Sequence, residues 1–134
     1  MQIADFYPAL EAFLLSLPGV TTDYKPEWDW KRFLLEGKQF AAFCGDGSDH
    51  ALITMKCEPD FNDFVRQAHP GVIIPGYYCN KVHWNSVHPD GGVPAALVEE
   101  MCERGYRLVR GALPKRVQAQ LPALEPKPEI TEEA

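Results

Sequence analysis

The segment from Asn80 to Asn85, with the sequence Asn-Lys-Val-His-Trp-Asn, contains the side chains of this chain that are best suited to bind a ligand. Side chains alternate between the two faces of a strand, so a strand through this segment would present Lys81, His83 and Asn85 together. Lysine supplies positive charge for phosphate groups, and asparagine offers a hydrogen-bond donor and an acceptor to base edges. The spacing predicts a surface that contacts nucleic acid.

A second group of positive charges follows further along the sequence. The net charge of the chain is -6, which disfavours nucleic-acid binding because phosphate neutralisation provides most of that affinity. Residues 104–121 nevertheless contain five basic residues and no acidic residue. On the expected helix, Arg104 and Arg107 each follow a glutamate by four residues, an arrangement that forms ion pairs. The remaining cations are the candidates for phosphate contact: Arg110, Lys115 and Arg116.

Each of these residues also has a structural interpretation. Asn80 can satisfy a turn, Asn85 can satisfy a neighbouring backbone group, and His83 can be a hydrogen-bonded structural residue. The three C-terminal cations can complement the negative end of the helix that precedes them. Trp84 is expected in the core, since large aromatic side chains dominate core burial.

Catalytic and metal-binding chemistry finds little support in the sequence. Cys79, His83 and His88 are spaced by four and five residues, but no fourth ligand accompanies them, and structural zinc sites usually supply paired ligands. No glycine-rich phosphate loop, nucleophile elbow or catalytic cysteine signature occurs. We therefore expect no enzymatic activity, no cofactor and no bound metal.

The composition indicates where the protein resides. Four widely spaced cysteines favour free thiols in a reducing compartment over a disulfide framework. No apolar stretch approaches the roughly 20 residues that span a bilayer, and the start of the sequence lacks the pattern of a secretory signal. We expect a cytoplasmic protein without membrane contact.

The elements that must position the candidate residues follow from the hydrophobic periodicity. Apolar residues recur every three or four positions from Ile3 to Leu17, which predicts one helix with Pro8 in its first turn. Residues 31–35, 38–44 and 51–57 are expected to form an antiparallel meander, with a tight turn at 36–37. A helix over residues 59–69, strands at 72–74 and 81–87, and a long helix that begins at Pro94 complete the pattern.

This order, α-β-β-β-α-β-β-α, predicts an α+β fold in which helices pack on a mostly antiparallel, five-stranded sheet in two layers. Residues 1–121 are expected to form one domain, since a chain of this length buries a substantial core. Residues 122–134 contain three prolines and four glutamates and are expected to form an acidic, flexible tail.

Four motifs together resemble the MmcQ/YjbR family: Asn80-Lys81-x-His83-Trp84-Asn85-x-Val87, Asp90-Gly91-x-Val93-Pro94, Gly105-Tyr106-x-Leu108-Val109 and Leu113-Pro114-Lys115-Arg116. The resemblance extends over roughly residues 3–121. It implies a helix, β-meander, helix, two-strand, helix fold similar to that of type III secretion chaperones, and the family is commonly labelled as DNA-binding. The motif residues to which we assign a structural role are Asn80, Trp84, Asp90, Pro94 and Tyr106.

Two functions follow as hypotheses. The first is a domain that binds DNA or another nucleic acid through an electropositive surface of Lys81, His83, Asn85, Arg110, Lys115 and Arg116. The alternative is a protein-interaction module or a homodimeric, chaperone-like adaptor that uses the exposed face or edge of its sheet. Tyr24, Trp28 and Trp30 support the alternative, since exposed aromatic residues mark interfaces. A small-molecule-binding domain would require a concave pocket beside His83 or Cys79.

Overall fold

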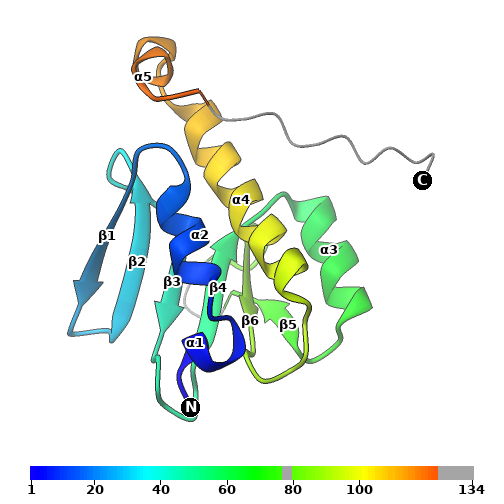
Figure 1. Cartoon of the computed structure of the whole chain (residues 1–134). Coiled ribbons are helices and arrows are strands. Elements are labelled where there is room, and N and C mark those ends of the chain that lie inside the picture. Colours follow the sequence, from blue (N-terminus) through cyan, green and yellow to red (C-terminus); the bar gives the residue numbers. More distant parts are fainter. Residues whose placement is uncertain (77–79, 124–134) are drawn as a thin grey trace.

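The structure, a computed structural model, describes residues 1–76 and 80–123 of the chain (Figure 1). Within these residues, six strands form one antiparallel sheet in the order β1-β2-β3-β4-β6-β5. The strands are β1 (Val20–Lys25), β2 (Trp30–Leu35), β3 (Lys38–Cys44), β4 (Leu52–Lys56), β5 (Ile73–Pro75) and β6 (Trp84–Val87). The helices are α1 (Ile3–Phe6), α2 (Leu10–Ser16), α3 (Pro59–Ala68), α4 (Ala95–Ala112) and α5 (Lys115–Gln120).

The predicted α+β class with helices on an antiparallel sheet is confirmed, but the prediction of five strands was wrong. The additional strand is β1, which pairs with β2 at one edge of the sheet from Val20↔Leu35 to Lys25↔Trp30. Every residue of β1 is half-buried or exposed. An edge strand of this kind lacks the apolar alternation by which a strand is recognised in a sequence.

The prediction of one continuous helix at the start of the chain was also wrong. Pro8 lies between α1 and α2, where the chain leaves the helical path at Tyr7. Proline lacks a backbone N–H and its ring clashes with the preceding turn, so the helix ends and starts again. Tyr7 is buried, and its hydroxyl donates a hydrogen bond to the carbonyl of Val93 at 2.7 Å.

The helices α1, α2 and α4 lie against one face of the sheet (Figure 1). The core fills the space between them with large apolar side chains, which include Leu14, Phe33, Phe40, Ile53, Met55 and Met101. The helix α4 comes closest to the sheet at Gly105. An added β-carbon there would lie 2.5 Å from the carbonyl oxygen of Lys56, so glycine is needed for this approach.

Three of the motif residues contribute to this frame. Tyr106 is fully buried, packs edge-to-face on Phe40 with 5.7 Å between ring centroids, and donates a hydrogen bond to the carbonyl of Pro18 at 2.6 Å. Pro94 is the N-cap of α4, one residue before the predicted position. Asp90 lies exposed in the turn that precedes it.

The described cysteines are buried and not disulfide-bonded: Cys44, Cys57 and Cys102. Burial raises the pKa of Cys57 to about 12 and also raises the pKa of Cys102. Among residues 1–76 and 80–123, no helix is long and apolar enough to cross a membrane. Cys79 and all but the first two residues of the predicted acidic tail lie outside the described residues.

Candidate functional site

The predicted strand over residues 81–87 begins only at Trp84, and the residues before it form a turn. The Oδ1 atom of Asn80 accepts hydrogen bonds from the backbone N–H groups of Val82 and His83, at 2.9 and 3.4 Å. The backbone N–H of Trp84 donates to the carbonyl of Asn80 at 3.0 Å. The side chains of Lys81 and His83 are exposed on this turn.

Asn85 does not share an exposed face with Lys81 and His83, contrary to the predicted alternation. Its side chain is fully buried on the helix-covered side of the sheet. Its Nδ2 donates to Oδ1 of Asn62 at 2.6 Å, and its Oδ1 accepts from Nε of Arg66 at 2.7 Å. A buried amide is tolerated only when it is hydrogen-bonded, and α3 supplies both partners.

The same two residues of α3 also hold the turn in place. The guanidinium of Arg66 donates to the carbonyls of Lys81 at 2.7 Å and Trp84 at 3.0 Å. Asn62 donates to the carbonyl of Val82 at 2.9 Å. The sequence predicted neither role. The available signal was the i, i+4 spacing of these two polar residues, which places them on one face of the helix.

The three C-terminal cations lie near the β1 edge of the sheet, away from the turn before β6. Arg110 is half-buried and donates to the hydroxyl of Tyr106 at 2.8 Å and to the carbonyl of Pro122 at 2.9 Å. Lys115 and Arg116 are exposed on α5, which continues from the C-terminal end of α4 (Figure 1). Leu121, directly after α5, packs beside Gly19 at the start of β1. The six predicted binding residues therefore do not form one surface.

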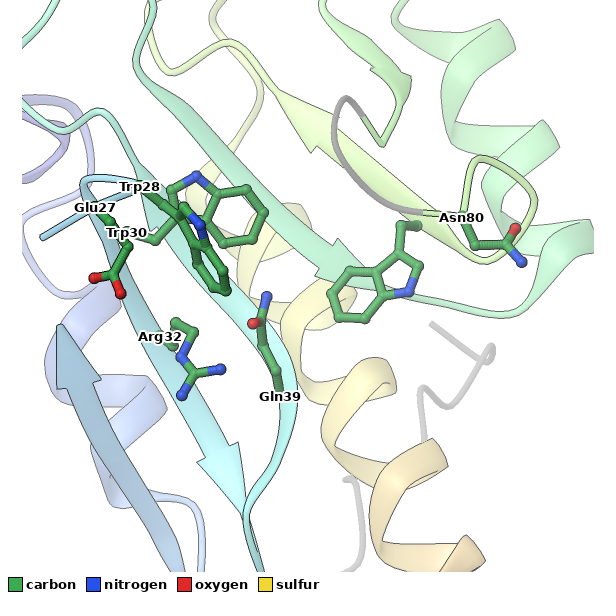
Figure 2. A pocket seen from close by; sticks show the side chains of 7 residues that line it. Glu27, Trp28, Trp30, Arg32, Gln39 and Asn80 are labelled. Carbon is green, nitrogen blue, oxygen red and sulfur yellow. The ribbon is translucent and has the colours of Figure 1, made fainter. Parts of the chain in front are cut away.

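A cavity of about 760 Å³ opens on the face of the sheet opposite α4. Figure 2 shows Trp28 and Trp30 together at one end of it, Asn80 at the other end, and Gln39 between them. Trp84 also lines the cavity, and the strand β3 that carries Gln39 lies between β2, with Trp30, and β6, with Trp84. The described residues that line it are Glu27, Trp28, Trp30, Arg32, Gln39, Asn80 and Trp84. The expectation of Trp84 as a core residue is corrected, because its indole is half-buried and lines this cavity.

The first two indoles pack against each other. The rings of Trp28 and Trp30 pack edge-to-face with 5.9 Å between centroids and 70° between planes. Trp30 is buried against the sheet, whereas Trp28 is 56% exposed. The loop that carries Trp28 is held by Asp29, whose side chain accepts a hydrogen bond from the hydroxyl of Tyr24 at 2.7 Å and whose carbonyl accepts one from the N–H of Gly45 at 2.8 Å.

The charges at the two ends of the cavity are arranged by strand register. Directly opposed residues of antiparallel strands lie on the same face. Lys25 of β1 is opposite Trp30, and Lys56 of β4 is opposite Trp84. Neither lysine was predicted as a site residue. The available signal for Lys56 was the alternation of residues 51–57, which places it on the less apolar face of its strand.

The cation inside the cavity is neutralised. Arg32 donates from Nε and one terminal nitrogen to the two carboxylate oxygens of Asp23, at 2.8 and 2.6 Å. This hydrogen bond lowers the pKa of Asp23 and raises the pKa of Arg32. The cavity therefore has a nearly neutral, aromatic lining with one further carboxylate, Glu27. Lys25 and Lys56 lie outside this lining, next to Trp30 and Trp84 on the same face of the sheet.

These features define the class of the protein as a small α+β fold with helices on one face of an antiparallel sheet and an aromatic cavity on the other. A sequence model of the YjbR family matches residues 15–108, and the chain belongs to this family. The predicted resemblance is thereby confirmed.

Similar proteins extend over most of the chain. Uncharacterized protein YbdF of Escherichia coli is 35% identical over 123 residues, 90% of this chain and 98% of that protein. Uncharacterized protein YjbR of Escherichia coli is 23% identical over 103 residues, 77% of this chain and 86% of that protein.

Two solved structures share the fold. The crystal structure of Deinococcus radiodurans protein DR2400 superposes with a TM-score of 0.78 at 29% identity, and the match covers 90% of this chain and 88% of that one. A Pseudomonas syringae protein superposes with a TM-score of 0.61 at 21% identity over 81% of this chain and 98% of that one.

Proposed function

We propose that this protein binds single-stranded nucleic acid on the uncovered face of its sheet, with bases stacked on the cavity tryptophans and phosphates held by neighbouring lysines. One observation carries the proposal. The strand register places Lys25 beside Trp30 at one end of the cavity and Lys56 beside Trp84 at the other. A cation next to a stacking platform, repeated along a groove, is the arrangement by which proteins bind single strands.

The turn next to Trp84 extends this surface. Lys81 and His83 are exposed there, and neither Lys56 nor Lys81 forms an ion pair with any of residues 1–76 and 80–123. These cations are therefore available to neutralise phosphates, which is the main source of affinity in such complexes. The proposal retains Lys81 and His83 from the sequence-based surface and moves the rest of the interface onto the sheet.

Single strands suit this surface better than duplexes. Bases within a duplex stack on one another, and only unpaired bases can lie flat against aromatic side chains. Trp28 and Trp84 both line the cavity. The DNA-binding label of the family points to the same class of ligand.

Fluorescence anisotropy with labelled single-stranded DNA, single-stranded RNA and duplex DNA, measured across a salt series, tests the proposal. We expect the single strands to bind more tightly than the duplex. The double variant Lys56→Glu with Lys81→Glu should weaken single-strand binding at least tenfold and reduce the salt slope by about 1.4, since each phosphate contact on a single strand contributes about 0.7.

The matched control is Lys115→Glu with Arg116→Glu, which makes the same charge reversal on α5. It should leave the affinity within about twofold of the parent protein, because α5 lies away from the cavity. Loss of binding in this control, with none in the Lys56 and Lys81 variant, would place the interface on α5 and contradict the proposal. Absence of binding at low salt would contradict nucleic-acid binding altogether.

A protein-interaction function is the second candidate, and the position of Tyr24 favours it. Tyr24 is 55% exposed on β1, an edge strand of the sheet. Exposed edges of this kind pair with a second copy or a partner strand. Light scattering distinguishes the two functions: a dimer that dissociates in Tyr24→Ser and persists in the Lys56 and Lys81 variant supports protein interaction.

A further inference from the structure

Gln39 lines the cavity, and its amide has no evident structural role there. It extends from β3 into the cavity beside the tryptophan pair (Figure 2), and β3 lies between the strands of Trp30 and Trp84. The side chain is half-buried, and its amide makes no hydrogen bond with any of residues 1–76 and 80–123. A primary amide has two donor hydrogens and an acceptor oxygen, so it can pair with a planar group that has a donor beside an acceptor.

The electrostatics of the cavity favour an uncharged heterocycle at this position. Arg32 is paired through two hydrogen bonds with Asp23, so it presents no net charge to a ligand. Glu27 in the lining disfavours a phosphate inside the cavity. Lys25 and Lys56 lie at its ends, where the phosphates of a bound strand would pass.

The size and the walls of the cavity suit the same ligand. A volume of about 760 Å³ lies within the range of about 300–1,000 Å³ in which proteins enclose small organic ligands. The walls at both ends are indoles, and each of the four nucleobases can stack on an indole ring. Base selectivity must therefore come from a polar group between the walls, and Gln39 lies there (Figure 2).

We infer that the cavity holds one unpaired nucleobase of the bound strand and that Gln39 pairs with the edge of that base. Glutamine makes its best two-point pairing with adenine, to the amino group and the neighbouring ring nitrogen. We call the cavity in this role the slot, and we expect the slot to select adenine among the four bases. This inference rests on the function proposed above and adds to it a base identity and the residue that reads it.

Tryptophan fluorescence titrations with the four homopolymeric single strands of about twelve nucleotides, and with the four nucleoside monophosphates, test the slot. We expect quenching by all four strands, with oligo-deoxyadenosine bound about tenfold more tightly than oligo-deoxycytidine, because a two-point pairing discriminates by that order. Adenosine monophosphate should quench in the same direction at a much higher concentration, since it lacks the phosphates that reach the lysines.

Gln39→Leu is the decisive variant, because leucine keeps much of the side-chain volume and removes the amide. It should bind all four strands with nearly equal affinity while the salt slope remains that of the parent protein. The matched control is Gln120→Leu on α5, where the glutamine is exposed and away from the cavity; it should retain the adenine preference.

The outcomes separate this inference from the proposed function. If Gln39→Leu ranks the strands as the parent protein does, Gln39 does not read the base, although the strand-binding function stands. If the strands bind in a salt-dependent manner without quenching tryptophan, the slot is wrong and only the lysine contacts remain. If adenosine monophosphate binds as tightly as the adenine strand, the ligand is a free nucleotide, and if no strand binds at all, both proposals fail.

Discussion

The two faces of the sheet bury their side chains in different ways. On the helix-covered face, Phe33, Met55 and Ile53 are fully buried in one continuous apolar cluster. On the other face, Thr54 and Ser86 are buried and hydrogen-bonded to each other at 2.9 Å, while Trp28 remains 56% exposed.

This difference separates stability from binding. A face that is covered by helices leaves no room for a ligand, so its residues contribute only to packing of the core. The other face carries the exposed Trp28, the half-buried Trp84 and Gln39, and lysines, which we expect to contribute little to folding and, under the proposed function, to contact the ligand. Substitutions on the first face should therefore lower the free energy of unfolding, and substitutions on the second should lower affinity at nearly constant stability.

The largest expected contrast is between Phe33→Ala and Trp28→Ala. Removal of a fully buried phenylalanine should lower the free energy of unfolding by roughly 3–5 kcal/mol. Loss of the more exposed Trp28 should lower it by less than about 1 kcal/mol, although the side chain is larger. Urea denaturation followed by far-ultraviolet circular dichroism measures both, and equal losses would contradict the separation of the two faces.

The next effect concerns the closest approach of α4 to the sheet. Gly105→Ala should destabilise the protein by roughly 1–3 kcal/mol, because the new methyl group meets backbone oxygens of Lys56 and Phe40 at 2.5 and 3.1 Å. Gly111→Ala on the same helix is the control. No atom lies within 4 Å of its added β-carbon, and alanine favours helix by up to about 1 kcal/mol. Thermal denaturation should show shifts of opposite sign for the two variants.

The polar network behind the cavity gives a smaller effect that links the two faces. Asn85→Ala leaves the Oδ1 of Asn62 and the Nε of Arg66 without their partner, which should cost about 1–3 kcal/mol. Because Arg66 also holds the carbonyl of Trp84, the emission spectrum of the tryptophans should change as well. His83→Ala, an exposed neighbour, should stay within about 0.5 kcal/mol of the parent protein. An unchanged emission spectrum in Asn85→Ala would argue against the link.

The smallest effect is a pH dependence that belongs to the covered face. Burial raises the pKa of Cys57 from 9.0 to about 12, so the unfolded thiol releases its proton first. The stability contributed by this thiol is complete below pH 9 and falls as the pH rises between about 9 and 12. Between pH 8 and pH 10 the loss should be about 1 kcal/mol. Cys57→Ala should show a shallower decline in urea denaturation over the same range; an identical decline would contradict this assignment.

The parts of the fold that local patterns determine were predictable. The Glu36-Gly37 turn joins β2 to β3 as expected, with both residues at positive φ. The helix α3 was also predicted, but its apolar residues indicate its buried side only in part. Val65 is fully buried, whereas the apolar Phe64 is 66% exposed and the polar Asn62 is fully buried. That side of α3 faces polar atoms of the turn before β6, and no local pattern in either segment reveals their contact.

The candidate site was predictable in its residue types more than in its location. The aromatic segment around Trp28 and the motif around Trp84 were both recognised, but their meeting across one cavity depends on the register of β4 against β6 and of β1 against β2. The alternation assigned to residues 81–87 had the wrong phase, because α3 provides partners that let Asn85 lie in the core. Only the assembled sheet brings Gln39, Lys25 and Lys56 to the face with the cavity tryptophans.

The carbonyl of Trp84 accepts hydrogen bonds from two separate segments of the chain. The N–H of Gly76 donates to the carbonyl of Trp84 at 2.7 Å, and Arg66 donates to the same carbonyl at 3.0 Å. Ordering a mobile side chain on association costs about 0.5–1.5 kcal/mol. The hydrogen bonds order the backbone of Trp84 when the chain folds, so the binding of a ligand leaves only the indole itself to be ordered at this end of the cavity. The exposed Trp28 at the other end retains the freedom to adjust to ligands of different thickness.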